Sequence, residues 1–249
     1  MRSSSVPGEL EIPAYNFSPR KITKFLLTII ALLILFNIAE RIFIRWLNAA
    51  NGTQLISHYF NFDRESNFPS LYSALALGFC SYLLAIITTL KKIERARFTR
   101  HWKALSLIFL FLAIDEACSI HELFIPILRG ALDARGIFYF TWVIPAFLLL
   151  LIFLISFRKF IYNLPTKTKT LFVTAGIVYV AGALGMELIG GYIADNFGYG
   201  TVYGIASSIE EILEMLGIVV FINALLCYIQ SRSKQLHLSL SFYSASKKS

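Results

Sequence analysis

Cysteine and histidine are scarce in this chain, which has three cysteines and four histidines among 249 residues. Cys80, Cys118 and Cys227 match no metal-binding or redox spacing. All three fall within long apolar stretches, so they are predicted to be small apolar side chains that pack within helices. A zinc site of the usual cysteine and histidine type is therefore not expected.

Charged residues are also few, at 15% of the chain, whereas 57% of the residues are hydrophobic and the mean hydropathy is +0.66. This composition is typical of a membrane protein and argues against a soluble domain. A helix needs about 20 apolar residues to cross about 30 Å of hydrocarbon. Six stretches reach that length: Ile22 to Trp46, Ser70 to Leu90, Ala104 to Leu128, Ile137 to Phe160, Thr170 to Ala194, and Val202 to Ile229.

The formal net charge of +8 is distributed unevenly along the chain. Basic residues crowd 91–103 and 158–169, precede the first apolar stretch and follow the last, whereas the alternate loops hold few. By the positive-inside rule, this pattern predicts six spans with both termini in the cytoplasm. The basic loops suit an anionic lipid surface, so no nucleic-acid partner is expected.

The predicted fold is therefore all-α, a polytopic helical bundle in the cell inner membrane. Residues 1–21 form a cytoplasmic tail, 22–230 the six-helix transmembrane domain, and 231–249 a second cytoplasmic tail. No cleavable signal peptide is expected, because about twenty polar residues precede an apolar run that is too long for one.

Apart from Glu40, which is next to Arg41 near the outer boundary, seven carboxylates interrupt the apolar stretches, and they are the main candidates for function. Each costs roughly 2.5 to 3.5 kcal/mol near a bilayer centre, so such groups normally face a bundle interior or water. Only His121 and Arg41 could offset them inside the membrane. We therefore predict a site for protons or cations on the third, fifth and sixth helices, formed by Asp115, Glu116, His121, Glu122, Glu187, Glu210, Glu211 and Glu214.

Helical periodicity predicts which of these residues share a face. Asp115, Ser119 and Glu122 would line one stripe of a continuous third helix, with His121 pointing away from it. Glu210 and Glu214 would be stacked on one face of the sixth. In the fifth, small residues four apart, such as Ala181 and Gly185, predict close helix packing.

Three functions remain open at this point. The leading one is proton- or cation-coupled transport, because stacked acids can relay protons or admit cations. The second is an intramembrane metal-dependent hydrolase acting on a lipid, with a divalent cation held by Asp115, Glu122, Glu187, Glu210 and Glu214; the paired Glu-x-x-His pattern of di-metal bundles is absent. The third is a non-catalytic membrane assembly factor. The expected partners are membrane lipid and either a small cation or a lipid substrate, and the sequence leaves the oligomeric state open.

The first outer loop, between Leu47 and Pro69, holds the run from His58 to Glu65, in which aromatic residues alternate before three charges. It is predicted to lie on the outer membrane surface or to form a lid over the bundle.

Four segments together resemble an uncharacterised family of bacterial multi-pass membrane proteins. They are Phe62-Asp63-Arg64-Glu65 with Pro69, Asp115-Glu116 with Ser119-Ile120-His121-Glu122, Glu187-Leu188-Ile189-Gly190-Gly191, and Glu210-Glu211 with Leu213-Glu214-Met215-Leu216-Gly217. The resemblance runs from about residue 22 to residue 229. It implies a bacterial inner membrane but no mechanism. Ceramidase-type intramembrane hydrolases also combine acids, serine and histidine, but they need several histidines for zinc, and this chain departs from them there.

Overall fold

The computed structural model describes residues 18–47, 59–64 and 66–246, and the described part of the chain contains helices and no strand. The long elements are α1 (Pro19–Leu47), α3 (Phe68–Ile93), α4 (Thr99–Cys118), α5 (Ile120–Leu132), α6 (Val143–Tyr162), α7 (Thr166–Val180), α8 (Glu187–Phe197) and α9 (Thr201–Ser246). A 3-10 turn, η1 (Gly136–Phe138), precedes α6, and a π-helical turn, η2 (Ala181–Met186), joins α7 to α8.

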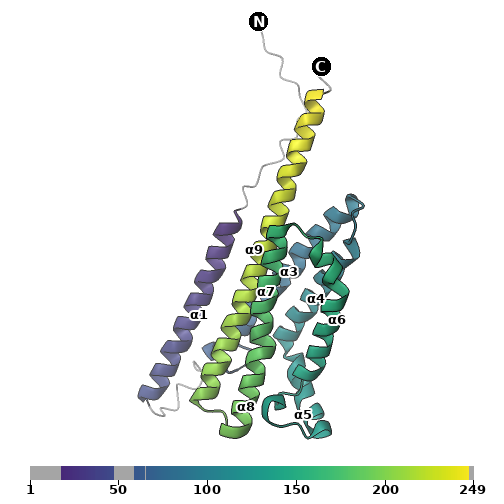
Figure 1. Cartoon of the computed structure of the whole chain (residues 1–249). Coiled ribbons are helices and arrows are strands. Elements are labelled where there is room, and N and C mark those ends of the chain that lie inside the picture. The colour runs from purple at the N-terminus through teal and green to yellow at the C-terminus, as the bar shows by residue number, and fades with distance from the viewer. Residues whose placement is uncertain (1–17, 48–58, 65, 247–249) are drawn as a thin grey trace.

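These helices stand side by side in an elongated bundle (Figure 1). Among the described residues, five helical segments are long and apolar enough to cross a membrane, with α7, η2 and α8 together as one of them, and the number rises to six if the bent pair α4 and α5 counts as one span. The start of α1 and the end of α9 lie at the same end of the bundle (Figure 1). The expected all-helical architecture is confirmed, with five or six segments of membrane-spanning length, and the third predicted span is broken.

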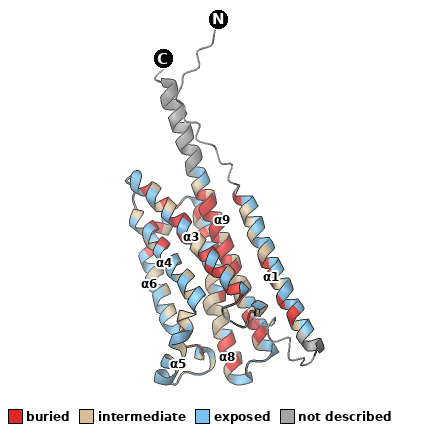
Figure 2. Ribbon diagram, turned by 180° about the vertical axis from the view of Figure 1, so that it is seen from behind, coloured by how far each residue is buried: buried red, intermediate tan, exposed pale blue. Residues whose placement is uncertain are grey.

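Burial is concentrated on α9 and α3, which form the centre of the bundle (Figure 2). Met215, Ile222 and Leu225 on α9 have no exposed surface, and Leu84 on α3 has none either. Large apolar side chains on the outer helices are instead exposed, as Phe147, Leu149 and others on α6 illustrate. An apolar outer surface of this extent suits contact with lipid tails rather than water.

The start of α3 follows from its sequence. The Asn67 side chain accepts a hydrogen bond from the Ser70 backbone N–H at 2.9 Å, and Ser70 Oγ accepts one from the Asn67 N–H at 3.0 Å. This reciprocal cap, with Pro69 in the first turn, fixes where the helix begins. Along its length, α3 packs on α4 through reciprocal bonds from each of Ser81 and Ser106 to the other's carbonyl.

The third predicted helix, Ala104 to Leu128, is not continuous. It ends at Cys118, and α5 starts at Ile120 with a bend of 77° between the two. Ser119 at the corner has φ 50° and ψ 43°, a left-handed conformation that stops the helix. The prediction of one stripe formed by Asp115, Ser119 and Glu122 is therefore wrong. Cys118, predicted to pack inside, is exposed beside the break, whereas Cys80 is buried.

Close packing of α7 and η2 on α9 depends on two glycines. A Cβ on Gly182 would lie 2.8 Å from the Glu210 carbonyl oxygen, and a Cβ on Gly217 would lie 2.7 Å from the Tyr179 backbone nitrogen. The sequence predicted tight packing here, but through Ala181 and Gly185; Ala181 is exposed, and Gly185 faces only its own helix. The residue that meets α9 is Gly182.

Remaining boundaries differ modestly from the sequence predictions. The span expected to start at Ile137 begins at Val143, after η1. At the other end of the chain, α9 continues as helix to Ser246, through most of the segment predicted to be a tail. Most of residues 1–21, along with His58 and Glu65 of the first outer loop, lies outside the described residues.

Candidate functional site

A small polar cavity of about 70 Å³ lies where the first outer loop, α5, α8 and α9 meet. This volume holds a few water molecules. Its lining comes from these four parts and from Phe140, between η1 and α6, and is listed here: Phe62, Asp63, Arg64, His121, Glu122, Ile125, Phe140, Glu187, Tyr203, Ser207, Glu210 and Glu211. Five of the eight residues predicted as a site, namely His121, Glu122, Glu187, Glu210 and Glu211, therefore face one space.

Two of these acids form a pair between helices. Glu187, at the start of α8, and Glu210, on α9, both line the cavity, and their carboxyl groups lie close enough to act on each other. Two neighbouring carboxylates repel each other, so a proton on one of them or a cation between them would balance their charge. The pair is therefore a ready acceptor of one positive charge.

Trp142 holds Glu187 in place. Its indole Nε1 donates a hydrogen bond to Glu187 Oε1 at 2.6 Å. Indole is a donor only, so Glu187 uses this oxygen as an acceptor whatever the state of the pair. The His121 ring lies 4.8 Å from the Trp142 ring, centroid to centroid, and covers it on the cavity side.

Asp115 and His121 are directly bonded, although periodicity placed them on different faces. Asp115 Oδ1 accepts a hydrogen bond from the His121 backbone N–H at 2.9 Å, and Oδ2 lies 3.1 Å from His121 Nδ1. The bend at Ser119 makes this possible, because it folds the first turn of α5 back over the last turn of α4. The prediction that His121 points away from Asp115 is wrong for the same reason. The carboxylate also sits at the start of α5, where the helix dipole favours negative charge.

Glu116 and Glu214 do not line the cavity. Both act electrostatically on the Tyr179 hydroxyl, as do Asp115 and Glu211. Glu210 and Glu214 were predicted to be stacked on one face of α9, but they contact different neighbours. The Glu214 side chain lies against Gly182, whereas Glu210 lies near Glu187.

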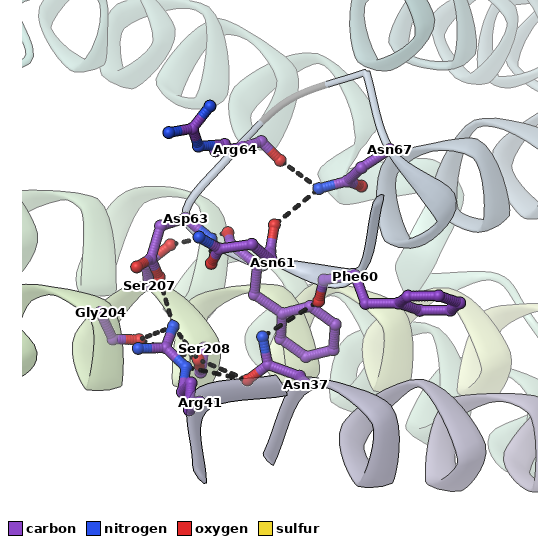
Figure 3. A network of polar contacts seen from close by, with 11 residues as sticks. Asn37, Arg41, Phe60, Asn61, Asp63, Arg64, Asn67, Gly204, Ser207 and Ser208 are labelled. Atoms are coloured by element: carbon purple, nitrogen blue, oxygen red, sulfur yellow. Dashed lines mark hydrogen bonds and ion pairs between the residues drawn. The ribbon is translucent and has the colours of Figure 1, made fainter. Parts of the chain in front are cut away.

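A second polar network joins the cavity residues Asp63 and Ser207 to α1 and its neighbours (Figure 3). The Arg41 guanidinium pairs with Asp63 at 2.6 Å and donates to the Gly204 carbonyl at 3.0 Å and to Ser208 Oγ at 3.2 Å. Its Nε donates to Asn37 Oδ1 at 3.1 Å. One side chain therefore joins α1, the first outer loop and α9.

The described part of the first outer loop packs into the bundle. Phe62 is only 2% exposed, and its carbonyl accepts a hydrogen bond from Ser207 Oγ at 2.9 Å. Asn37 Nδ2 donates to the Phe60 carbonyl at 3.1 Å, and the Asn67 side-chain amide donates to the carbonyls of Asn61 and Arg64 (Figure 3). Of the two predictions for this loop, the lid over the bundle agrees with this packing better than the surface element does.

Three residues of the site were missed by sequence reasoning: Tyr203 and Asp63, which line the cavity, and Trp142, which donates a hydrogen bond to Glu187. Asp63 lies in a loop, where an acid needs no explanation. The role of all three depends on contacts across the fold, and no spacing in the sequence signals it. The presence of Arg41 within the first apolar stretch was the one available hint for Asp63.

Among the described residues, no three His, Cys, Asp or Glu side chains are grouped closely enough to hold one metal ion. Glu187 and Glu210 supply two such ligands, and Asp115 is turned to His121. The five-residue metal set predicted from sequence therefore gains no geometric support here, although the acid pair by itself remains a cation acceptor.

Comparison with known proteins places this site within a family. No curated protein and no solved structure matches the chain. One family model does match, over residues 25–229, which includes the acid pair, the Asp115–His121 pair and the Arg41 network. The chain therefore belongs to the family described as Domain of unknown function (DUF8692).

Proposed function

We propose that the protein couples the movement of protons or small cations to transport across a membrane, with Glu187 and Glu210 as the binding groups. The observation that carries the proposal is that these two carboxyl groups, from different helices, line the same small cavity. Charge exchange at such a pair would alter the contact between α8 and α9 directly. Ionisable groups inside membrane bundles commonly serve proton and ion pathways.

The size of the cavity limits what the site would accept. About 70 Å³ admits a proton, a few waters or a bare inorganic cation, and no organic solute of ordinary size. The acids on its wall outnumber the one arginine, Arg64, that lines it. A small cation fits both the volume and the charge.

Purified protein in liposomes with a trapped pH indicator tests the proposal. A potassium diffusion potential, or a gradient of Na⁺ or Mg²⁺, should drive a change of internal pH. Glu187→Gln and Glu210→Gln should reduce that change to the level of protein-free vesicles, because an amide keeps the size of the carboxyl group but does not ionise. Both variants should still insert into the membrane and accumulate.

Asp133→Asn is the matched control, since Asp133 is an exposed acid at the end of α5, outside the cavity. Its φ of 45° suits asparagine as well as aspartate, so the fold should be unaffected. Wild-type behaviour in the Glu210→Gln variant would remove the acid pair from the mechanism. Wild-type protein that matches empty vesicles under every gradient would end the proposal.

The Asp115–His121 pair favours one alternative, hydrolysis of a lipid. A carboxylate bonded to Nδ1 orients an imidazole and fixes its tautomer, as general-base sites require. Release of fatty acid or headgroup from fluorescent ester, amide and phosphodiester lipids, lost in both Asp115→Asn and His121→Asn, would establish that activity. Under the transport proposal, none of these lipids is turned over.

The proposed setting is a bacterial inner membrane, with both termini in the cytoplasm. The basic loops carry this orientation. Reporter fusions after Ser249 and within 91–103 should be cytoplasmic, and fusions within 52–67 should be external. A C-terminus on the outside would contradict the orientation and the count of six crossings together.

A further inference from the structure

The short helix α5 has two faces of opposite character, and the outer one is exposed in the described part of the chain. Leu123, Phe124 and Ile127 fall on one side at about 100° per residue, and they are 65%, 50% and 67% exposed. No residue of α5 is buried. The side opposite carries Glu122, Ile125 and Arg129, and it faces the protein.

Three contacts fix which side faces inward. Thr141 Oγ1 donates a hydrogen bond to the Ile125 carbonyl at 3.0 Å, and Arg129 Nε donates to the Tyr139 carbonyl at 2.8 Å. The Arg129 guanidinium also lies 3.6 Å from the centre of the Tyr139 ring. These contacts hold the helix in one orientation, and its apolar side therefore faces outward.

The depth of α5 follows from the helix before it. From a first turn that holds Arg100 and Lys103, α4 runs for 20 residues, or about 30 Å, to the end of the bundle at which α5 lies (Figure 1). The chain then turns by 77°, so α5 runs close to the plane of the membrane at the far end of α4. Tyr139 and Trp142 lie next to it, and such aromatic side chains are typical of the membrane interface.

We infer that α5 is an interfacial helix, which lays its Leu123, Phe124 and Ile127 face among the lipids at one surface of the membrane. The occupant of this face is the boundary between lipid headgroups and acyl chains, the environment that amphipathic helices prefer. The opposite face supplies His121, Glu122 and Ile125 to the cavity wall. One wall of the cavity is thus carried by a helix that rests on lipid.

Site-directed spin labels measure this placement without reference to activity. Labels are introduced singly at Phe124, at Ile127, at Ile152 in the middle of α6 and at the exposed Asp133, in full-length protein whose three cysteines have been replaced. The protein is reconstituted in phosphatidylethanolamine and phosphatidylglycerol vesicles. Collision with oxygen reports lipid, and collision with a water-soluble nickel chelate reports water.

The labels at Phe124 and Ile127 should collide mainly with oxygen, at a depth clearly shallower than the label at Ile152, while Asp133 should collide mainly with nickel. High accessibility to nickel at both Phe124 and Ile127 would overturn the inference. A depth of these two labels equal to that of the label at Ile152 would also overturn it, because α4 and α5 would then form one bent span.

Lysine substitution gives a second readout. Ile127→Lys should accumulate in the membrane like wild type, because a lysine near the surface extends its charge to water. Ile152→Lys should accumulate poorly. Equal loss in both variants would place α5 deep in the hydrocarbon and contradict the inference, whether or not the acid pair moves protons.

Discussion

Replacement of Gly217 by alanine is expected to lower the free energy of unfolding by about 3 kcal/mol, near the upper end of the usual cost of overpacking. The new Cβ would lie 2.7 Å from the backbone nitrogen of Tyr179 and 2.9 Å from its Cα. Backbone atoms do not rotate aside as a side chain does. Helices α7 and α9 would have to separate, and with them the elements that present Glu187 and Glu210.

Gly176→Ala is the control for Gly217→Ala. Gly176 lies on α7, and a Cβ there would meet nothing within 4 Å. This change should be neutral or stabilise the helix by up to about 1 kcal/mol, because alanine restricts the unfolded chain more than glycine does. Thermal unfolding in detergent, followed by the loss of the monodisperse chromatographic peak, compares the two variants. Equal midpoints would show that the α7–α9 contact is looser than described.

Removal of the Arg41 side chain should cost about 3 kcal/mol, because it removes several hydrogen bonds of a charged group at a partly buried site. The Arg41 and Asp63 side chains are 29% and 23% exposed. Without Arg41, Asp63 keeps its charge beside the acids of the cavity wall, and the carbonyl of Gly204 loses a donor. Arg41→Lys should recover part of the loss, since an ammonium group restores the charge but not the set of bonds made by Nε and Nη2.

A double-mutant cycle isolates the pair from its surroundings. Arg41→Ala and Asp63→Ala together should destabilise the protein by clearly less than the sum of the two single changes, because each single change leaves one charge unpaired. Arg135→Ala, at an exposed position, should leave the melting temperature unchanged. Strict additivity of the two changes would mean that the 2.6 Å contact contributes no coupling energy.

Hydropathy and charge were enough to predict the helical membrane architecture and the helices that carry acids, because both depend on the average polarity of long segments. Hydropathy and charge could not predict the break at Ser119. No glycine or proline marks it, and its conformation is stabilised by a contact between Asp115 and the start of α5. Local patterns predict continuous helix here, and tertiary contacts override them.

The candidate site also has a part that could be predicted from sequence and a part that could not. Apolar context alone singled out Glu187 and Glu210, whereas their pairing depends on how α8 is rotated against α9. The lid-like packing of Phe62 and the bond from Trp142 likewise depend on segments that are distant in sequence. Spacing along one helix determines which residues share a face, but it says nothing about which neighbour that face meets.

In the π-helical turn η2, the number of residues is as important for the position of Glu187 as their identity. Ala181–Met186 contains no charged or polar side chain, and it lies directly before Glu187. Deletion of a single residue from it would restore ordinary α-helix and rotate everything downstream by about 100° relative to α7, at a cost of only about 1.5 Å in span. Glu187 would then turn away from Glu210. Outside Gly182, which has no room for a Cβ, this segment should therefore accept apolar substitutions but no change in its number of residues.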